Sequence, residues 1–397
     1  MERVAIVAAR RTAIGTFGGM FAEVSAVKLG IAALSAALED ARLTPADLDE
    51  VIAGNILSAG LGQNVARQIG IGAGTPNEVP AYTVNKLCGS GLKAVDLGAG
   101  SIRLDDARII AAGGTENMTR SPYIVPSARY GARMGNAELV DTMIHDALTD
   151  TFNDYHMGVT AENLADRWKI SREEMDLFAA ESQNRAERAM EAGRFADEIV
   201  AVEVPQRRGE PIVADTDEHP RRGVTAEALG KLRPAFRKDG RVTAGNSSGI
   251  NDGACFVILA SESAVAERNL TPLAWVVAAG SAAVDPAYMG YGPVPATTKA
   301  LGKAGWRLAD VELAELNEAF AAQSLAVLKG FEQELGGIDP AIVNVNGGAI
   351  ALGHPVGASG ARILVTLLHE MARRDVHKGL ATLCIGGGQG IAMLVER

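Results

Sequence analysis

An internal repeat is the strongest constraint on what this chain can fold into. Three segments of the first 120 residues recur in the same order near the C-terminus, about 260 to 275 residues further on. Residues 46–55 resemble 309–317, residues 82–85 resemble 343–346, and residues 109–114 resemble 382–387. Two unrelated α/β domains could share composition by chance, but the shared order favours a duplication of one α/β unit.

Within each half, apolar runs alternate with stretches of helical spacing. In the first half we expect strands at 4–9, 51–56, 82–84 and 107–112, and helices at 26–41 and 91–104. Strands that alternate with helices are typical of an α/β fold with a largely parallel sheet. Ligands of such sheets bind beyond the carboxyl ends of the strands, so two related halves can share one cleft.

The pattern is interrupted between about Glu116 and Asn246, where Arg, Glu, Met and Pro are frequent. An amphipathic helix is expected from Ser171 to Ala192, with Ser171 as N-cap and acidic residues in the first turn. We therefore predict three units: residues 1–118 with 249–270, an inserted loop domain at 119–248, and a second α/β half at 271–397.

Composition narrows the possible partners. The formal net charge is -10, which argues against nucleic acid as the main partner because phosphate binding needs a basic face. The 3 cysteines are far apart and have no metal-like spacing, which predicts free thiols and no metal site. Neither a signal segment nor a run of 18 apolar residues is recognised, so we expect a cytoplasmic protein without a membrane span.

Cys88 occupies a turn between an expected strand and an expected helix, in the sequence Asn-Lys-Leu-Cys-Gly-Ser-Gly. Glycine permits a sharp turn and close approach of a ligand. The helix N-terminus supplies free N–H groups that favour a thiolate. A lone cysteine is more often an inert core residue, so this turn alone leaves the two interpretations about even.

His354 lies in the corresponding turn of the second half, within the glycine-rich segment 344–360. A lone histidine is more often structural than catalytic. However, a Cys–His pair is the usual means of activating a thiol near neutral pH, and the repeat places the two side chains in equivalent turns.

Two weaker motifs follow strands of the second half. Cys384 precedes the glycine loop 386–390, which lacks the Lys of a phosphate-binding Walker loop. Asn317 and Glu318 follow the expected strand 313–316, where such a pair is commonly a helix cap. When it is taken alone, each motif can be explained by a purely structural role.

Together the four motifs resemble the thiolase family, in its biosynthetic acetoacetyl-CoA branch, over essentially the whole chain. The segment from His156 to Asn163 is similar to the loop of the biosynthetic members. The resemblance implies a duplicated αβαβα layered fold with an inserted loop domain. It also implies a reversible Claisen condensation of two acetyl-CoA to acetoacetyl-CoA and CoA, in a homotetramer built as a dimer of dimers.

Roles for individual residues are likewise implied by the resemblance. Cys88 would carry the acetyl group, His354 would take its proton, and Cys384 would act as acid and base on the acetyl methyl group. Asn317, through a water, would join His354 in one oxyanion hole, and the N–H groups of Cys88 and Gly386 would form the other. No metal and no redox cofactor are implied.

The resemblance also implies a binding path for the substrates. His156 and Met157 would shape a short acyl pocket. The coenzyme A path would be lined by Arg221, Phe236, Ala244, Ser248, Met289, Ala319 and Phe320. Basic residues at 221–222 and 231–238 could attract the phosphates, although a solvated loop is the commoner explanation for any one of them.

Three alternatives remain at this point. A thiolase for longer or branched 3-ketoacyl-CoAs differs only in substrate size. An acyl-CoA-binding protein that has lost catalysis would be expected to lack one of Cys88, His354 or Cys384. A condensing enzyme that uses a carrier protein predicts other residues around its cysteine and no second cysteine of the Cys384 type.

Overall fold

The computed structural model describes residues 2–206 and 208–397 and contains one large mixed sheet. Its strands run in the order β15-β16-β17-β14-β1-β13-β5-β3-β4, with two short strands, β2 and β10, paired alongside. The first half contributes β1 (Val4–Thr12), β2 (Gly15–Thr16), β3 (Glu50–Gly54), β4 (Ala81–Val84), β5 (Ile109–Asn117) and β13 (Asn251–Ser261), while β10 (Ile199–Val200) comes from the segment 119–248. The second half contributes β14 (Ala274–Ala283), β15 (Leu313–Leu316), β16 (Lys378–Ile385) and β17 (Gln389–Glu396).

The strand pairing confirms the duplication. The parallel pair β3–β5 has its counterpart in the parallel pair β15–β16. The antiparallel series β5–β13–β1 has its counterpart in β16–β17–β14. The two halves meet where β1 and β14 pair, with Ala5 opposite Trp275 and Ile6 opposite Ala274. The sheet is therefore two copies of one unit joined at their equivalent strands.

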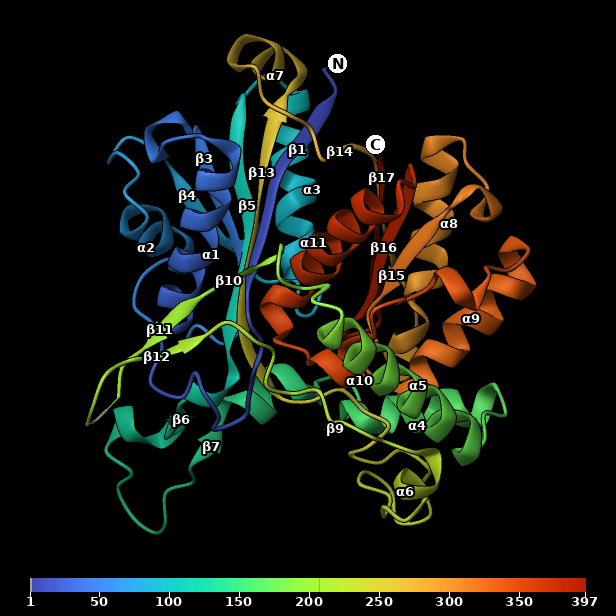
Figure 1. Ribbon diagram of the computed structural model, residues 1–397. Coiled ribbons are helices and arrows are strands. Elements are labelled where there is room, and N and C mark those ends of the chain that lie inside the picture. The colour runs from blue at the N-terminus through green and yellow to red at the C-terminus, as the bar shows by residue number, and fades with distance from the viewer. Residues whose placement is uncertain (1, 207) are drawn as a thin grey trace.

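Helices cover the outer faces of both halves and also fill the space between them (Figure 1). The first half is covered by α1 (Ala26–Ala41) and α2 (Val65–Gly72), and the second by α8 (Pro293–Ala304) and α9 (Ala321–Leu335). Between the halves lie α3 (Ser90–Arg103) and α11 (Val356–Arg374). This arrangement confirms the expected layered αβαβα fold.

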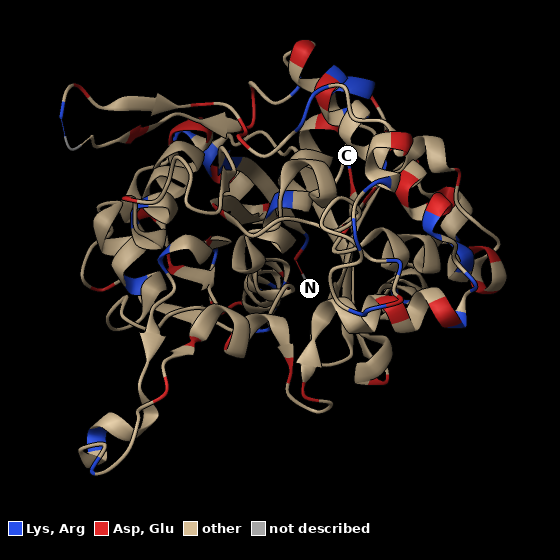
Figure 2. Ribbon diagram, turned by 90° about the horizontal axis from the view of Figure 1, so that it is seen from below, with Lys and Arg blue, Asp and Glu red and all other residues tan. Residues whose placement is uncertain are grey.

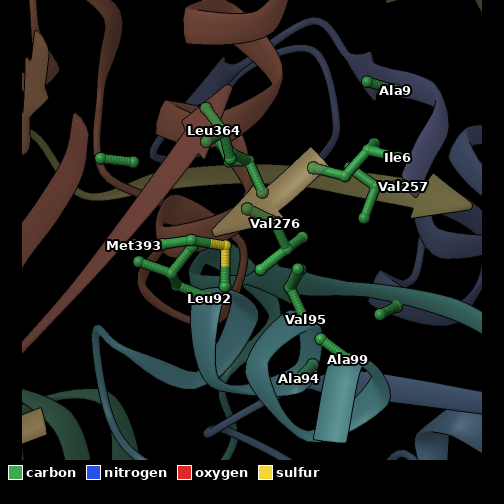
Figure 3. Close-up of a cluster of buried hydrophobic side chains, with 14 of the residues drawn as sticks. Ile6, Ala9, Leu92, Ala94, Val95, Ala99, Val257, Val276, Leu364 and Met393 are labelled. Carbon is green, nitrogen blue, oxygen red and sulfur yellow. The ribbon is translucent and has the colours of Figure 1, made fainter. Parts of the chain in front are cut away.

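The central layer contains a large apolar cluster. Figure 3 shows Leu92 and Val95 of α3 near Leu364 of α11, with Val276 and Met393 from strands of the second half. All five side chains belong to one buried cluster. Burying a side chain of this size stabilises the fold by roughly 1.5–3 kcal/mol, so this shared cluster holds the two halves together.

Glycines let α3 and α11 touch at their first turns. A Cβ on Gly91 would lie 2.8 Å from the backbone nitrogen of Ala361, and one on Gly360 would lie 2.6 Å from that of Leu92. Such short contacts exclude any side chain at the two positions. Because Cys88 and His354 lie just before these helices, the glycine contact brings their turns together.

Most expected elements of the first half are confirmed, and boundaries differ by a few residues. The helix at 26–41 is α1, and the helix after Ser171 is α5 (Arg172–Glu191). Ser171 and Glu174 form a reciprocal capping box at its start. The strand expected at 107–112 instead runs from Ile109 to Asn117, because β5 stays paired with β13 as far as Asn117 opposite Asp252.

The repeat is less regular at residues 343–346, which match β4 in sequence. Only one isolated bridge forms there, between Val343 and Ala314. The next residue, Asn344, uses its side chain as a substitute for a strand, since its Oδ1 accepts from Leu316 N and its Nδ2 donates to Leu316 O, both at 2.8 Å. A side-chain amide thus replaces the backbone ladder.

The segment 119–248 lies largely outside the sheet. Its helices are α4 (Met157–Arg167), α5 and α6 (Ala226–Gly230), and its short strands are β6 (Tyr123–Ile124), β7 (Val140–Asp141), β8 (Thr149–Asp150), β9 (Tyr155–His156), β11 (Val202–Val204) and β12 (Ile212–Ala214). Two further short helices are α7 (Glu262–Arg268) and α10 (Ala349–Leu352). The division into three units at 118, 248 and 270 stays a prediction.

Charged residues lie mostly at the periphery of the molecule. Figure 2 shows Lys and Arg interspersed with Asp and Glu around a centre drawn largely in tan. Within the described part of the chain, no helix combines the length and apolar character needed to cross a membrane.

Candidate active site

Cys88 is held in a tight turn between β4 and α3. Leu87 adopts the left-handed conformation, with φ 46°. The hydroxyl of Ser90 accepts from Lys86 N at 2.8 Å and donates to Leu87 O at 2.6 Å, which closes the turn. The helix begins at Ser90, so Cys88 sits immediately before the first free N–H groups of α3.

The thiol of Cys88 is the neutral form at physiological pH. Loss of solvent around the sulfur raises the pKa of Cys88 to about 11, although hydrogen bonding from the backbone N–H of Gly386 and of Cys88 itself acts in the opposite direction. The negative charge of Glu116 raises it further. A nucleophilic attack by Cys88 would therefore need a base.

His354 is the residue expected to act as the base for Cys88, and its imidazole is buried. Its Nδ1 lies 2.5 Å from the hydroxyl of Ser359, which itself lies 2.9 Å from the carbonyl of Pro355. Its backbone N–H donates to Asn251 Oδ1 at 2.9 Å. Burial, and secondarily the charge of Arg362, lowers the pKa of His354 to about 3.

The hydrogen bonds of Ser359 determine which imidazole nitrogen is free. A hydroxyl that donates to Pro355 O can accept from Nδ1–H, and this leaves a lone pair on Nε2. Nε2 of His354 is buried and has no hydrogen-bond partner among the described residues. A neutral imidazole whose Nε2 has no partner is suited to accept a proton.

Cys384 ends β16 just before the turn to β17. Its side chain is 1% exposed. Burial, followed by the proximity of Cys88, raises its pKa above the ordinary value of a thiol. The turn itself is made by glycines, and Gly387 and Gly388 both have positive φ, which favours glycine.

One cavity of about 460 Å³ collects these groups. Cys88, His354, Cys384 and Gly386 all line it, although residues 88 and 384 are nearly 300 positions apart. All nine residues expected to bind the substrates also line it: His156, Met157, Arg221, Phe236, Ala244, Ser248, Met289, Ala319 and Phe320. Thirteen predicted residues thus share one cavity wall.

Asn317 is the predicted site residue that the cavity lining does not include. It follows β15, its backbone N–H donates to Thr382 O at 3.0 Å, and its side chain is 1% exposed. Neither Nδ2 nor Oδ1 has a hydrogen-bond partner among residues 2–206 and 208–397. A buried amide of this kind is a typical binding place for an ordered water molecule.

Aromatic rings form one part of the cavity wall. The rings of His156 and Phe236 stack with centroids 4.7 Å apart, and Phe320 meets Phe236 edge-on at 6.1 Å. A Cβ on Gly158 would lie 2.2 Å from the Phe236 ring, so only glycine fits after Met157. Residues 244–248 join this wall because Ser248 N donates to Ala319 O at 3.0 Å.

Sequence reasoning missed several lining residues. Among them are Thr16 and Phe17, which follow β1, and Ile250, which precedes β13. His219 also lines the cavity, and its pKa is lowered by burial and by the charge of Arg221. The one sequence signal for His219 is that it lies two residues before Arg221, which is expected to line the coenzyme A path. Thr16, Phe17 and Ile250 lie in or beside short connecting segments, and the path of such segments depends on tertiary packing.

The basic residues near the cavity are partly engaged by acids. Arg237 pairs with Asp166 at 2.7 Å, and Lys231 lies 3.3 Å from Glu227. Arg221 lines the cavity itself. In the described ranges, no group of three or more His, Cys, Asp or Glu side chains is arranged to hold a metal ion.

A thiol, an imidazole and a second thiol line one largely apolar cavity of a duplicated α/β fold, which is the arrangement expected of an enzyme that transfers acyl groups. Comparison with known proteins gives the family. The family model for the thiolase N-terminal domain matches residues 4–263, and the model for the thiolase C-terminal domain matches residues 270–397. The chain belongs to the thiolase family.

Relatives and solved structures agree over the full length. An acetyl-CoA acetyltransferase of Pseudomonas aeruginosa is 60% identical over 397 residues, covering all of both chains. An acetyl-CoA acetyltransferase structure from Syntrophomonas wolfei superposes with a TM-score of 0.98 at 41% identity, again covering both chains fully. A human mitochondrial 3-ketoacyl-CoA thiolase structure has a TM-score of 0.95 at 45% identity, covering 100% of this chain and 98% of that one.

Proposed function

We propose that the chain is an acetyl-CoA C-acetyltransferase that joins two acetyl-CoA to acetoacetyl-CoA and CoA, or cleaves acetoacetyl-CoA in reverse. The observation that carries the chemistry is that Cys88, His354 and Cys384 line one cavity. The substrate assignment is supported by full-length relatives at 56–60% identity that bear the name acetyl-CoA acetyltransferase.

In the first step, the sulfur of Cys88 attacks the thioester carbonyl of acetyl-CoA and its proton passes to Nε2 of His354. The raised pKa of the thiol and the lowered pKa of the imidazole keep both groups neutral until the attack begins. The tetrahedral intermediate then expels the coenzyme A thiolate, which takes the proton from His354. The product of this step is acetyl-Cys88 and free CoA.

Two backbone N–H groups would bind the oxyanion of that intermediate. The N–H groups of Gly386 and Cys88 both hydrogen-bond the sulfur of Cys88 and lower its pKa, so they lie beside the atom that the acetyl group would join. One donor placed in advance is worth about 3–4 kcal/mol of transition-state stabilisation. No metal or redox cofactor is needed for this step.

In the second step, Cys384 would act in its thiolate form and remove a methyl proton from another acetyl-CoA. The enolate oxygen would be bound by His354, with Asn317 acting through a water. Ser359 suits both duties of His354, since its hydroxyl can accept from Nδ1–H or donate to Nδ1 when the proton sits on Nε2. The enolate carbon then attacks acetyl-Cys88, whose sulfur leaves and recovers the proton from Cys384.

Binding of the two thioesters is assigned to the remaining cavity residues. His156 and Met157 would enclose the acyl group, while the wall of Phe236, Ser248 and Phe320 would contact the pantetheine arm. Met289, Ala244, Ala319 and Arg221 complete the path proposed for coenzyme A.

A thiolase for longer 3-ketoacyl-CoAs is the second candidate, supported by the fold shared with the human mitochondrial enzyme. Thiolysis rates with acetoacetyl-CoA and with a C8 3-ketoacyl-CoA separate the two. We expect kcat/KM to favour the C4 substrate, and a preference for C8 would overturn the assignment.

We also propose a homotetramer in the cytoplasm. The arm around β6 and β7 carries large apolar side chains that are open to solvent, with Tyr130 80% and Met134 98% exposed. A second copy that covers such side chains would remove them from water. Light scattering of the purified protein tests the tetramer.

Mass spectrometry tests the central step of the proposal. Brief exposure to acetyl-CoA should add one acetyl group, and peptide mapping should place it on Cys88. Cys88→Ser should abolish thiolysis while thermal unfolding stays close to that of the unchanged protein. An adduct on Cys255 or Cys384 instead of Cys88 would refute the assignment of the nucleophile.

A further inference from the structure

Glu116, at the end of β5, is a fully buried carboxylate to which the reaction described above gives no role. It accepts four hydrogen bonds, all from N–H groups. Oε1 accepts from Asn55 Nδ2 at 2.9 Å and Leu57 N at 3.2 Å, and Oε2 accepts from Ile56 N at 3.1 Å and Gly357 N at 3.0 Å. Three of these donors belong to the first half of the molecule and one to the second.

On the first-half side, the carboxylate holds the residues that pack against the nucleophile. Ile56 and Leu57 form a small buried cluster with Val356, and Leu87 and Cys88 pack against that cluster. Their backbone N–H groups are two of the four donors to Glu116. We call Ile56 and Leu57 the floor of Cys88, because their cluster packs against the cysteine while their backbone N–H groups bond Glu116.

On the second-half side, the carboxylate holds the turn that carries the base. Segment 354–357 has two side-chain anchors in the first half, since His354 N donates to Asn251 Oδ1 and Gly357 N donates to Glu116 Oε2. The contact is tight, because a Cβ on Gly357 would lie 2.7 Å from Oε2. Glu116 thus links the floor of Cys88 directly to the turn of His354.

The donors require a carboxylate of this length. Each oxygen accepts two N–H groups, so an amide in its place would turn its own N–H₂ toward two donors. An aspartate would be one methylene too short to span the Asn55–Leu57 loop and Gly357 together. Burial raises the pKa of Glu116 itself to about 7, and in its charged form the carboxylate adds to the burial that raises the pKa of Cys88.

We propose that Glu116 is a positioning residue for acetyl transfer, whose carboxylate fixes the turn of His354 in one half against the floor of Cys88 in the other. The proposal rests on the function proposed above for those two residues. It predicts that the length of Glu116 sets the rate of acylation and that its charge contributes to the pH at which Cys88 reacts.

The test compares Glu116→Gln and Glu116→Asp with the unchanged protein, whose thiolysis of acetoacetyl-CoA is measured first. Glu312→Gln is the matched control, because Glu312 also accepts two backbone N–H groups, from His377 and Lys378, but lies outside the cavity lining. Two readouts are taken: kcat and KM for thiolysis, and the pH dependence of Cys88 alkylation by iodoacetamide, followed on the Cys88 peptide.

Both Glu116 variants should lose tenfold or more in kcat, with KM for CoA changed less than threefold. The alkylation profile should move to lower pH for Glu116→Gln, and it should move less for Glu116→Asp, which keeps the charge. Glu312→Gln should match the unchanged protein in both readouts. Inactivity of the unchanged protein would count against the proposed function rather than against this role, since alkylation needs no turnover.

A kcat of Glu116→Gln within twofold of the unchanged protein would overturn the proposal, as would equal shifts of the alkylation profile in the Gln and Asp variants. If Glu116→Gln fails to fold, Asn55→Ser provides the test, because it removes one donor of the four. A several-fold lower kcat at unchanged KM then supports the role, and an unchanged kcat overturns it.

Discussion

The hydroxyl of Ser359 lies 2.5 Å from Nδ1 of His354, five residues earlier in the chain. Ser359, near the start of α11, thereby orients the imidazole of His354, which lies two residues before that helix. Without the hydroxyl, a buried Nδ1–H would lose its acceptor, which costs about 1–3 kcal/mol. The orientation of the His354 ring is consequently fixed by a local contact.

Ser359→Ala should therefore lower kcat for thiolysis by roughly 10- to 100-fold, the rate equivalent of about 1.4–2.7 kcal/mol. Steady-state kinetics with acetoacetyl-CoA and CoA measure it. Ser324→Ala is the matched control, because the Ser324 hydroxyl is also buried but has no hydrogen-bond partner among the described residues. Equal losses in the two variants would contradict the role of Ser359.

Cys384→Ala should separate the two chemical steps. Acetyl exchange between acetyl-CoA and labelled CoA needs Cys88 and His354 alone, so it should persist within about tenfold, whereas condensation should fall roughly 10²–10⁴-fold with loss of the acid/base group. Cys255→Ala, which removes a buried sulfur of β13, should change neither rate. A parallel loss of exchange and condensation in Cys384→Ala would argue against separate roles for the two thiols.

Arg11→Leu should destabilise the fold strongly. Arg11 is fully buried and bonds Glu198 at 2.6 Å and Asp217 at 2.7 and 2.9 Å, so its removal leaves two buried carboxylates without their cation. Breaking a buried ion pair costs about 3–5 kcal/mol of unfolding free energy. Urea denaturation measures the change.

The neighbouring Arg10→Ala provides the comparison for that measurement. Arg10 pairs with Asp40 near the surface, where an ion pair contributes about 0–1 kcal/mol. A drop in unfolding free energy as large as that of Arg11→Leu would show that burial is not the deciding factor.

Glu315→Gln should change how stability depends on pH. Burial raises the pKa of Glu315 to about 8, despite the opposing charge of Arg362. A carboxyl group whose pKa is raised by folding stabilises the fold below its unfolded pKa and loses that contribution as pH rises through the folded value. The stability of Glu315→Gln relative to the unchanged protein should therefore rise between about pH 4.5 and pH 8.

Thermal unfolding at a series of pH values checks this. Glu312→Gln should behave in the opposite way, because backbone N–H groups of His377 and Lys378 lower the pKa of Glu312. That variant should lose relative stability as pH rises through the acidic range. A flat difference curve for Glu315→Gln would contradict a raised pKa in the folded state.

Local patterns in the sequence predicted the repeated unit and the two turns that carry Cys88 and His354. Strand and helix spacing, the N-cap at Ser171 and the glycines after Cys88 each depend on neighbours within a few residues. Prediction failed where a distant partner decides the structure. Asn344 replaces a strand pair with its side chain, and β5 continues because β13, 130 or more residues away, stays paired with it.

The chemical groups of this protein, their order and the kind of element that carries each one can be predicted from the amino-acid sequence alone. Which of these groups come into contact depends on how the chain packs. Cys88 and His354 share a cavity because Gly91 and Gly360 let two helices touch, and Glu116 joins their supports across the two halves. Such contacts depend on close packing between segments far apart in the chain, and no pattern of neighbouring residues specifies which segments pack together.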